Sequence, residues 1–283
     1  MPLVTTKQML AKAQQGGYAV GAFNVENMEM VQAVVEAAEE LRSPVILQTT
    51  PSTLNYAPPE LFLAIARAMA ESADVPVAMH LDHGDGLDIA IHSLKAGYTS
   101  IMIDGSHGTL EENIALSRSV VDECRFFGVP VEAELGKVGG KEDDLDGGDA
   151  NPYTDPHQAA HFVELTGVDF LAVAIGTAHG IYKNTPKLDK QRLSEIRERV
   201  SIPLVLHGTS GVADEDVKDC ISRGICKVNY ATDLRIAFSN GVKAYIADNP
   251  DVYDPKKYNN AGRESVKNYV MNKMYVVGSV GKA

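Results

Sequence analysis

The sequence has few cysteines and no long apolar run. Its three cysteines form no C-x-x-C pair, and their odd number argues against a disulfide framework. No apolar stretch approaches the roughly 20 residues that a membrane helix needs, and the N-terminal segment lacks the apolar core of a secretory signal. We therefore expect a cytoplasmic protein with reduced thiols and no membrane partner.

Basic residues are scarce relative to acidic ones. The 26 Lys and Arg residues against 38 Asp and Glu residues give a net charge of −12 in a chain of 283 residues. An acidic surface disfavours nucleic acid as a partner. It does not exclude an anionic small molecule, because a binding site can be locally positive within an acidic protein.

Short apolar runs rich in β-branched residues recur through nearly the whole chain and predict strands. The eight runs are residues 18–24, 44–49, 76–83, 99–104, 130–136, 170–176, 203–208 and 226–232. Amphipathic helical patterns fill the gaps, and Asp155-Pro156 and Gly167 are typical of the start and end of one such helix. Apolar strands that alternate with helices predict a parallel sheet covered by helices. Eight such units predict a (β/α)8 TIM barrel.

Other features of the sequence argue against folds other than a barrel. An open, doubly wound sheet would show a similar pattern, but no G-x-G-x-x-G follows the first predicted strand, which argues against a dinucleotide-binding version. Without an internal repeat or a domain linker, residues 1–283 are predicted to form a single domain.

Residues 233–250 and 263–277 predict extra C-terminal helices that are able to pack on a neighbouring subunit. The Gly- and Asp-rich segment 137–154 predicts a long functional loop.

Three histidines lie at or just past the ends of predicted strands: His83 in HLDHG, His179 in AIGTAHG and His207 in VLHGTSG. Neutral imidazole is a common metal ligand, and three protein ligands with one open position are typical of catalytic zinc. Taken alone, His179 or His207 would more often be a hydrogen-bonded polar residue. Because active sites of this barrel lie at the carboxyl ends of the strands, we predict that the three histidines bind a metal together.

Carboxylates accompany these histidines at the predicted strand ends. Asp82 precedes His83, where it is placed to act as a general acid or base or to orient the metal ligand. The alternative for Asp82 is a cap of the following helix. Asp104 and Glu134 end neighbouring strands. They are candidates for metal ligands in a second position or for partners of the histidines, and a buried ion pair is the alternative.

Two segments of small residues follow the last two predicted strands. Residues 207–211 (HGTSG) and 229–232 (NYAT) occupy the loops that usually hold phosphate in this barrel. Small side chains let backbone N–H groups approach phosphate oxygens, and hydroxyl groups add donors. A simple glycine-rich turn is the alternative. A zinc site beside a phosphate cradle indicates metal-assisted chemistry on a sugar phosphate.

Seven motifs resemble the class II, zinc-dependent ketose-bisphosphate aldolases and cover almost the whole chain in order. They are GYAVGAFNVEN, HLDHG, MIDGSH, VEAELGKVGGKEDD, AVAIGTAHGIY, LVLHGTSG and KVNYAT. The resemblance implies that His83, His179 and His207 hold Zn²⁺. It also implies that Asp104 and Glu134 stand at alternative metal positions.

The resemblance further implies catalytic and substrate-binding roles. Asp82 would exchange the proton of the C4 hydroxyl, and Glu142 in the GGKED segment would shuttle the proton of the carbon next to the ketone. The implied substrate-binding residues are Asn24, Gly180, Gly208, Thr209, Ser210, Asn229, Tyr230, Ala231, Thr232 and Arg263. Further family features are a monovalent cation (Na⁺ or K⁺) near the phosphate, a homodimeric or homotetrameric assembly and, in some relatives, an accessory subunit.

The motifs indicate two related substrates. GTAHGIY and TTPSTLNY resemble the tagatose-1,6-bisphosphate aldolases. In contrast, Arg263 stands where fructose-1,6-bisphosphate aldolases carry an arginine that reaches the distal phosphate of the neighbouring subunit. Thr209 departs from the Ala or Gly that is more common in relatives. We expect reversible cleavage of tagatose 1,6-bisphosphate to dihydroxyacetone phosphate and glyceraldehyde 3-phosphate. Fructose 1,6-bisphosphate or a related phosphorylated keto-sugar is the alternative.

Two other functions are compatible with parts of the sequence. Lys227 shares a strand face with Asn229 and is predicted to point into the barrel, where a desolvated lysine can form a Schiff base with a ketone. That mechanism would leave the three histidines without a purpose. A partner-dependent binding subunit is the second alternative, and the complete set of Asp82, the three histidines and Glu142 argues against it.

Overall fold

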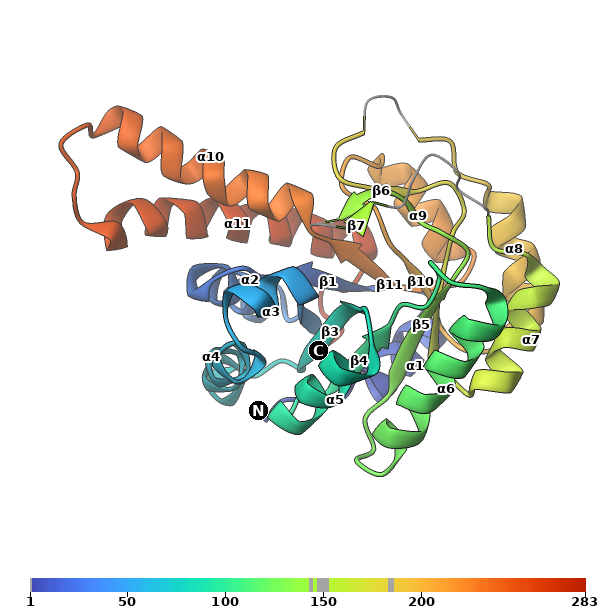
Figure 1. Cartoon of the computed structure of the whole chain (residues 1–283). Helices are drawn as coiled ribbons and strands as arrows, with labels where there is room; N and C mark the ends of the chain where they lie inside the picture. The colour runs from blue at the N-terminus through green and yellow to red at the C-terminus, as the bar shows by residue number, and fades with distance from the viewer. Residues whose placement is uncertain (1, 143–144, 147–152, 183–185) are drawn as a thin grey trace.

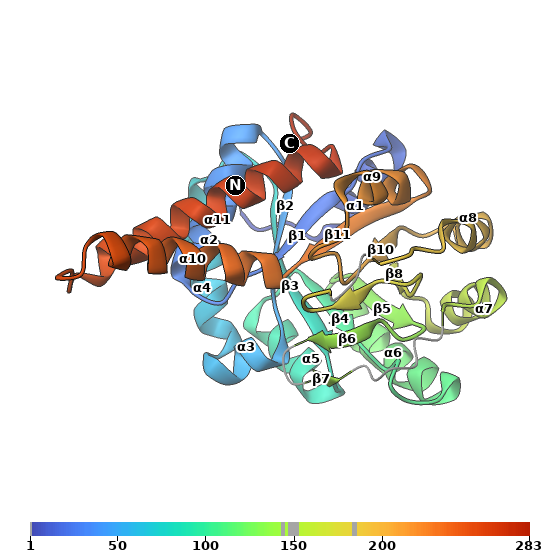
Figure 2. The same cartoon turned by 90° about the horizontal axis from the view of Figure 1, so that it is seen from above.

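Eight parallel strands close into a barrel within the residues that the computed structural model describes, 2–142, 145–146, 153–182 and 186–283 (Figure 1). The barrel strands are β1 (Val20–Asn24), β2 (Val45–Thr49), β3 (Val77–Gly84), β4 (Ser100–Ile103), β5 (Val131–Leu135), β8 (Phe170–Val173), β10 (Leu204–Leu206) and β11 (Ile225–Tyr230). They follow the order β1-β11-β10-β8-β5-β4-β3-β2 around the barrel (Figure 2). The predicted (β/α)8 TIM barrel is confirmed, with strand ends shifted by a few residues.

A ring of helices covers the outside of the barrel. Its members are α2 (Met28–Leu41), α4 (Pro59–Ser72), α5 (Leu87–Ala96), α6 (Leu110–Arg125), α7 (Pro156–Thr166), α8 (Lys190–Arg199), α9 (Asp214–Ser222) and α11 (Pro255–Val277). Each helix packs against the next, and α11 lies between α9 and α2 and closes the ring. Of the two predicted C-terminal helices, α11 therefore takes the eighth place in the outer layer. The other, α10 (Thr232–Asp248), packs along α11 and extends with it away from the barrel (Figure 1).

Local signals explain where helices begin and end. The Asp155 side chain accepts hydrogen bonds from two backbone N–H groups in the first turn of α7, and Pro156 occupies that turn. Gly167 ends the helix in the left-handed conformation that glycine adopts without strain (φ 69°). The helix thus lies between the residues that the sequence pattern predicted. None of the helices in the described part of the chain combines the length and the apolar composition that crossing a membrane requires.

The sequence pattern did not predict α1 (Thr6–Gly16), which closes the amino-terminal end of the barrel. Its Met9, Leu10 and Ala13 pack with apolar residues of the barrel strands. The Thr6 hydroxyl donates a hydrogen bond to Ser100 at the start of β4. Because this end is plugged, the carboxyl ends of the strands form the open end, where active sites of this fold lie.

A small sheet lies beyond the carboxyl end of β5, in the order β7 (Leu145–Asp146), β6 (Gly139–Glu142) and β9 (Ala178–His179). β6 pairs in parallel with β9, and Gly140 lies beside His179. The predicted loop after the fifth strand is therefore tied at its base to the segment that carries His179. The segment after β2 also has regular structure, because it forms the short helix α3 (Pro51–Tyr56).

Candidate metal centre and active site

Three histidine rings converge at the carboxyl ends of the barrel strands. His83 lies near the end of β3, His179 lies in β9 and His207 follows β10. Ligand nitrogens of the three rings lie within 4.8 Å of one another, and His83 Nε2 is 2.9 Å from His207 Nδ1. His83 and His207 are buried, whereas His179 is partly exposed. Three nitrogen donors with access from one side form the arrangement that a catalytic metal needs.

The backbone at His83 explains how two consecutive residues both face the interior. Side chains alternate along a regular strand, so Asp82 and His83 would point to opposite sides. The pairing of β3 with β4 shifts in register between Leu81 and Gly84, and His83 has φ 49°, a conformation that is uncommon for residues other than glycine. This bulge turns His83 towards His207. Bulges and backbone strain of this kind are concentrated at functional sites.

A carboxylate lies against the second ring nitrogen of two of these histidines. His83 Nδ1 is 3.0 Å from Asp104 Oδ2, and His207 Nε2 is 2.9 Å from Glu132 Oε1. An ionised carboxylate can only accept, so in both contacts the hydrogen is on the histidine nitrogen. The two nitrogens that face each other then carry lone pairs, which repel at this distance. A cation held between the rings removes the repulsion, so the donor set fits a divalent metal such as Zn²⁺.

Burial and hydrogen bonds set the protonation of this cluster. Burial lowers the pKa of His207 below its usual value, although the hydrogen bond to Glu132 acts in the opposite direction. Burial by itself would raise the pKa of Asp104, but the hydrogen bonds from His83 and Ser106 outweigh it and hold that pKa below the usual range. A neutral imidazole and an ionised carboxylate are the forms that a metal ligand and its partner need.

Asp104 and Glu134 form a second group with His83, and the three side chains are close enough together to bind one metal ion. Ligand atoms of the three residues lie within 4.8 Å of one another, and all three are buried. Glu134 Oε1 accepts a hydrogen bond from the Val138 N–H at 3.2 Å, and Oε2 is 3.4 Å from His207 Nδ1. The two carboxylates named from the sequence are therefore adjacent to the histidine triad.

Asp82 is fully buried inside the barrel and is held by three side-chain amides. Its Oδ2 accepts from Asn24 Nδ2 at 2.9 Å and from Gln48 Nε2 at 3.2 Å. Its Oδ1 accepts from Asn229 Nδ2 at 3.0 Å. The alternative role as a helix cap is wrong, because the residue that caps α5 is Gly86. A buried carboxylate that is fixed by three donors and directly precedes His83 can serve as a general acid or base for a bound substrate.

Lys227 points into the barrel, where it pairs with a carboxylate. Its Nζ is 2.9 Å from Glu132 Oε2, and both side chains are buried. A Schiff base needs a neutral, accessible amine, whereas this Nζ forms a buried ion pair. The geometry therefore does not support the Schiff-base mechanism.

A small hollow lies next to His179 at the open end of the barrel. Its other lining residues are Gly180, Gly208, Thr209, Ser210, Asn229, Ala231 and Thr232. The Thr209 hydroxyl donates to the Asn229 carbonyl and so joins the loop after β10 to strand β11. Because α10 begins at Thr232, the hollow lies at the amino terminus of a long helix, where backbone N–H groups attract anions.

Three residues named from the sequence are not seen at the histidine cluster. The side chains of two of them make contacts away from it, and the third side chain is not among those that the structure describes. The Tyr230 ring stacks on Phe23, with ring centroids 5.5 Å apart, on the side of β11 opposite to the barrel interior. Arg263 lies on α11 and forms an ion pair with Glu36 of α2. The Glu142 side chain lies outside the described residues, although its backbone belongs to β6.

The sequence-based set lacked three residues that the structure places around the site, Gln48, Glu132 and Tyr182. Gln48 and Glu132 interrupt predicted apolar strands, and Glu132 shares a strand face with Glu134. A polar residue in a buried strand is a signal that would have identified both. The Tyr182 hydroxyl contacts the backbone of Ala178 and of Gly208, and no local pattern indicates that contact.

Comparisons with known proteins agree with this geometry. The model of the family described as fructose-bisphosphate aldolase class-II matches residues 4–282. The YdjI aldolase from Escherichia coli K12 is 39% identical, with a TM-score of 0.88 and 99% of each chain covered. A putative fructose-1,6-bisphosphate aldolase from Coccidioides immitis is 33% identical, with a TM-score of 0.89 over 97% of this chain and 96% of that one. Fructose-bisphosphate aldolase (Fba) from Campylobacter jejuni, at 24% identity and a TM-score of 0.83, shares the fold over 100% of this chain and 97% of its own.

Proposed function

This chain belongs to the class II fructose-bisphosphate aldolase family, and we propose that it cleaves a ketose 1,6-bisphosphate to dihydroxyacetone phosphate and glyceraldehyde 3-phosphate. Membership makes it a carbon–carbon lyase. The proposed reaction is a reversible, Zn²⁺-dependent retro-aldol cleavage with tagatose 1,6-bisphosphate as the preferred substrate. The observation that carries the proposal is the convergence of His83, His179 and His207, with the buried carboxylate of Asp82 directly before His83 on β3.

Asp82 and Glu142 are assigned the two proton transfers. Zn²⁺ held by the three histidines would supply a Lewis acid for substrate oxygens. In the cleavage direction, Asp82 takes the proton of the C4 hydroxyl, the C3–C4 bond breaks and C4 becomes the aldehyde carbon. The electron pair of that bond stays on C3, next to the ketone. Glu142 then delivers a proton to C3, which completes dihydroxyacetone phosphate.

The hollow beside His179 is the proposed site of the 1-phosphate. Its small residues and the amino terminus of α10 offer backbone N–H groups to an anion. These donors make the site locally favourable to an anion although the chain carries a net charge of −12, and a Na⁺ or K⁺ ion near the phosphate would add to this attraction. Asn24 and Asn229 already donate to Asp82, so they connect the proposed base to the substrate side of the site.

Two sequence motifs are the basis of the substrate assignment. GTAHGIY and TTPSTLNY favour the tagatose epimer, and the second segment contributes helix α3 after β2. Arg263 is proposed to reach the distal phosphate of a neighbouring subunit. Since its guanidinium pairs with Glu36 of its own chain, phosphate binding requires exchange of that ion pair. Tagatose 1,6-bisphosphate therefore stands first and fructose 1,6-bisphosphate second.

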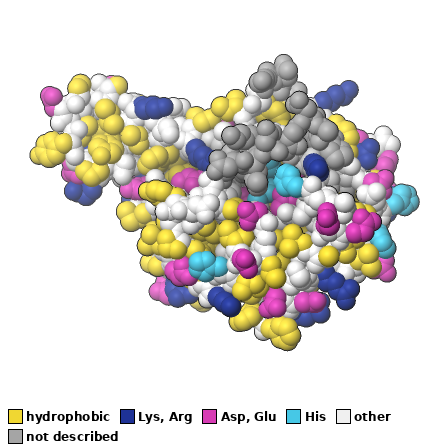
Figure 3. Space-filling model, viewed as in Figure 1, with side chains coloured by type: hydrophobic (Ala, Val, Ile, Leu, Met, Phe, Trp, Pro, Cys, Tyr) yellow, Lys and Arg dark blue, Asp and Glu magenta, His cyan; other side chains and the backbone are white. Residues whose placement is uncertain are grey.

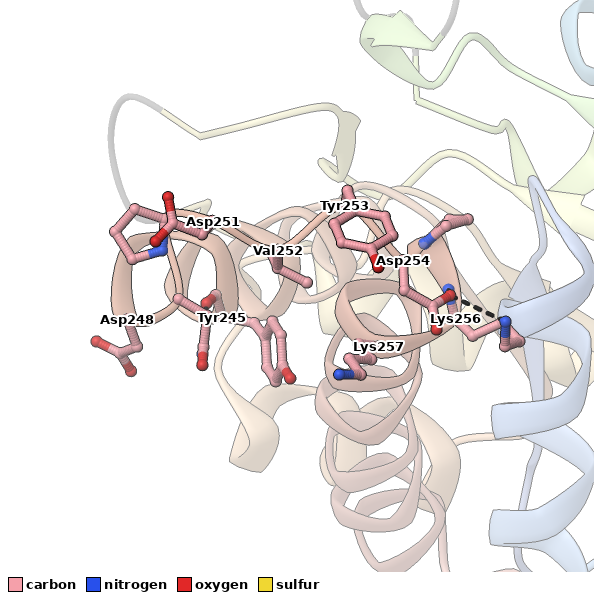
Figure 4. A pocket seen from close by; sticks show the side chains of 11 residues that line it. Tyr245, Asp248, Asp251, Val252, Tyr253, Asp254, Lys256 and Lys257 are labelled. Atoms are coloured by element: carbon pink, nitrogen blue, oxygen red, sulfur yellow. Dashed lines mark hydrogen bonds and ion pairs between the residues drawn. The ribbon is translucent and has the colours of Figure 1, made fainter.

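A homodimer or homotetramer is proposed, with a second copy covering the arm formed by α10 and α11. Within α10, all of whose residues are described, Leu234 alone is buried. Large exposed apolar side chains on the two helices and their connection are Ile236, Ile246, Tyr253 and Tyr275, and apolar side chains are visible along the arm in Figure 3. Figure 4 shows a hollow at the arm tip that mixes tyrosine, acidic and lysine side chains. Exposed apolar surface of this kind is typical of a protein interface.

An accessory subunit is the alternative occupant of the arm surface. Light scattering of the purified chain distinguishes self-assembly from a monomer that needs a partner. The cytoplasmic location and the absence of nucleic-acid and membrane partners stay predictions from the sequence.

The test of the proposed function is cleavage of tagatose and fructose 1,6-bisphosphate by the purified chain, as isolated, after chelation and after Zn²⁺ add-back. The expected result is Zn²⁺-restored cleavage that favours tagatose by about tenfold, or about 1.4 kcal/mol of transition-state discrimination. The reverse preference would establish the fructose enzyme. Full activity after chelation, with trapping by borohydride, would overturn the metal mechanism. Cleavage of neither substrate would favour the partner-dependent binding subunit or a different keto-sugar.

A further inference from the structure

A buried ion pair lies behind His207, on the side of its ring that faces away from His83. Lys227 Nζ is 2.9 Å from Glu132 Oε2 and 3.1 Å from Oε1. Glu132 Oε1 is in turn 2.9 Å from His207 Nε2. The side chains of all three residues are at most 1% exposed. The described residues that line the hollow beside His179 include neither Lys227 nor Glu132.

Stability alone does not account for this ion pair. The desolvation of two buried charges can exceed their attraction, so a buried ion pair is weak evidence for a stabilising role. The geometry indicates another role. Because a carboxylate has no hydrogen to donate, Glu132 bonds to His207 only when Nε2 carries the hydrogen. Nδ1 then carries the lone pair, and Nδ1 is the atom that faces His83.

Lys227 also holds the carboxylate of Glu132. Its ammonium group contacts both carboxylate oxygens and lies 3.5 Å from His80 Nε2. His80 Nδ1 is 2.8 Å from Ser100 Oγ, which also accepts from the hydroxyl of Thr6 on α1. The contacts therefore connect Glu132 to the plugged end of the barrel and limit its movement.

We propose that Glu132 and Lys227 are positioning residues of the metal centre. Glu132 holds His207 in the tautomer and orientation that present Nδ1 to the metal, and Lys227 supplies the opposite charge that keeps Glu132 in place. The inference rests on the proposed Zn²⁺-dependent function and adds two residues to it. Since neither residue lines the hollow, their replacement acts first on metal binding.

Zinc affinity of matched variants tests the inference, with the Kd measured by competition with a chromophoric chelator. Glu132→Gln keeps the side-chain size, but its amide can bond to either tautomer of His207. The Kd for Zn²⁺ should therefore rise by about tenfold to a hundredfold. Asp219→Asn, the same change in an ion pair with Lys190 on the outer helices, should leave the Kd unchanged.

The double variant separates positioning from a structural role. Lys227→Met leaves the Glu132 charge buried without its partner and should lower both the melting temperature and the zinc affinity. Glu132→Gln combined with Lys227→Met removes both charges and should regain stability. Its zinc affinity should stay at least as weak as that of Glu132→Gln. Recovery of stability together with wild-type zinc affinity would overturn the inference.

A measurement on the unmodified chain covers the case in which the variants do not fold. In Zn²⁺-loaded protein with isotope-labelled histidine, NMR should find the hydrogen of His207 on Nε2 and the metal on Nδ1, with signals identified by their loss in His207→Asn. Hydrogen on Nδ1 would overturn the inference, as would a folded Glu132→Gln variant with wild-type zinc affinity. Tight zinc binding without cleavage of either bisphosphate would contradict the proposed function instead.

Discussion

The hydroxyl of Tyr182 donates a hydrogen bond to the carbonyl oxygen of Gly208, 2.7 Å away. The same hydroxyl accepts one from the Ala178 N–H at 2.6 Å. Ala178 precedes His179 in β9 and Gly208 follows His207, so one side chain connects the two segments that carry these candidate metal ligands. The loops are also in close backbone contact, because a Cβ at Gly208 would lie 2.7 Å from the Ala178 backbone.

We expect Tyr182→Phe to weaken the metal centre without unfolding the barrel. The two lost hydrogen bonds contribute about 1 kcal/mol each, so the Kd for Zn²⁺ should rise by up to about thirtyfold. Chelator competition measures the Kd, and thermal unfolding monitors the fold. Tyr56→Phe is the control, because Tyr56 is 83% exposed. An unchanged Kd in folded Tyr182→Phe would mean that the loops hold the histidines without this hydroxyl.

Gly140→Ala should displace His179. Gly140 has φ 84°, and a Cβ there would overlap the His179 backbone, 2.7 Å from its nitrogen. Gly128→Ala is a matched control, because Gly128 has φ 67° and its Cβ would meet nothing within 4 Å. Both variants carry the strain of a left-handed alanine, about 1 kcal/mol. Gly140→Ala alone should also lose Zn²⁺ affinity and cleavage activity, and equal effects of the two substitutions would refute this expectation.

Asp82→Asn should separate proton transfer from metal binding. The substitution removes the proposed base, so kcat should fall by about a hundredfold to ten-thousandfold. The Kd for Zn²⁺ should change little, since the hydrogen bonds of Asp82 run to Asn24, Gln48 and Asn229 and not to the histidines. Equilibrium dialysis and steady-state kinetics measure the two quantities. A kcat near that of the wild type would assign the base to another residue.

Arg263→Ala tests whether the distal phosphate is held by this side chain. A charge-assisted hydrogen bond contributes about 1.5–3 kcal/mol, so kcat/KM for the bisphosphate should fall by about tenfold to a hundredfold. The value for a ketose 1-phosphate should stay the same. Lys267→Ala is the control, because Lys267 lies on the same helix and pairs with Glu40 of α2 in the same way. Equal losses on both substrates would limit Arg263 to its ion pair with Glu36.

The metal-free protein should lose stability as the pH falls below neutral. Burial lowers the pKa of His80 and of His207 below 6.5, and the charge of Lys227 adds to the effect at His80. The unfolded chain therefore binds protons near pH 6.5 that the folded chain does not bind. The free energy of unfolding should therefore decrease as the pH falls below about 6.5. For each histidine the decrease is up to about 1.4 kcal/mol per pH unit, and it ends at the lowered pKa of the folded state.

Urea unfolding of the chelated protein between about pH 7.5 and about pH 5.5 measures this dependence. His80→Gln should reduce the slope of stability against pH, because it removes one of the two buried histidines that stay neutral in the folded chain. His92→Gln is the control, since His92 is 55% exposed. A stability that stays constant over this range would contradict the prediction.

Much of the architecture could be predicted from local patterns. Apolar runs of strand length alternate with amphipathic helices, and this alternation is visible without any knowledge of distant contacts. The carboxyl ends of parallel strands share one end of a barrel, so residues at strand ends were candidates for a common site. His83, His207 and Asp82 were named on that basis. The structure brings the two histidine rings together and buries Asp82 inside the barrel.

The sequence alone did not predict that the side chains of Asp82 and His83 both face the barrel interior. Strand alternation assigns consecutive residues to opposite faces, but the register shift against β4 and the positive φ of His83 bring both to the interior. The role of α11 as the eighth outer helix likewise depends on its packing between α9 and α2. Neither feature has a signature within its own segment.

The sequence by itself determined the strands, most of the helices and the end of the barrel at which the candidate metal ligands lie, because each of these depends on residue patterns within one segment. The tertiary structure alone decided which polar groups meet. The contact between His83 and His207 joins residues 124 positions apart, and the bridge from Tyr182 to Gly208 joins two loops. Such contacts depend on the register in which all eight strands close, and that register is set by packing across the whole barrel.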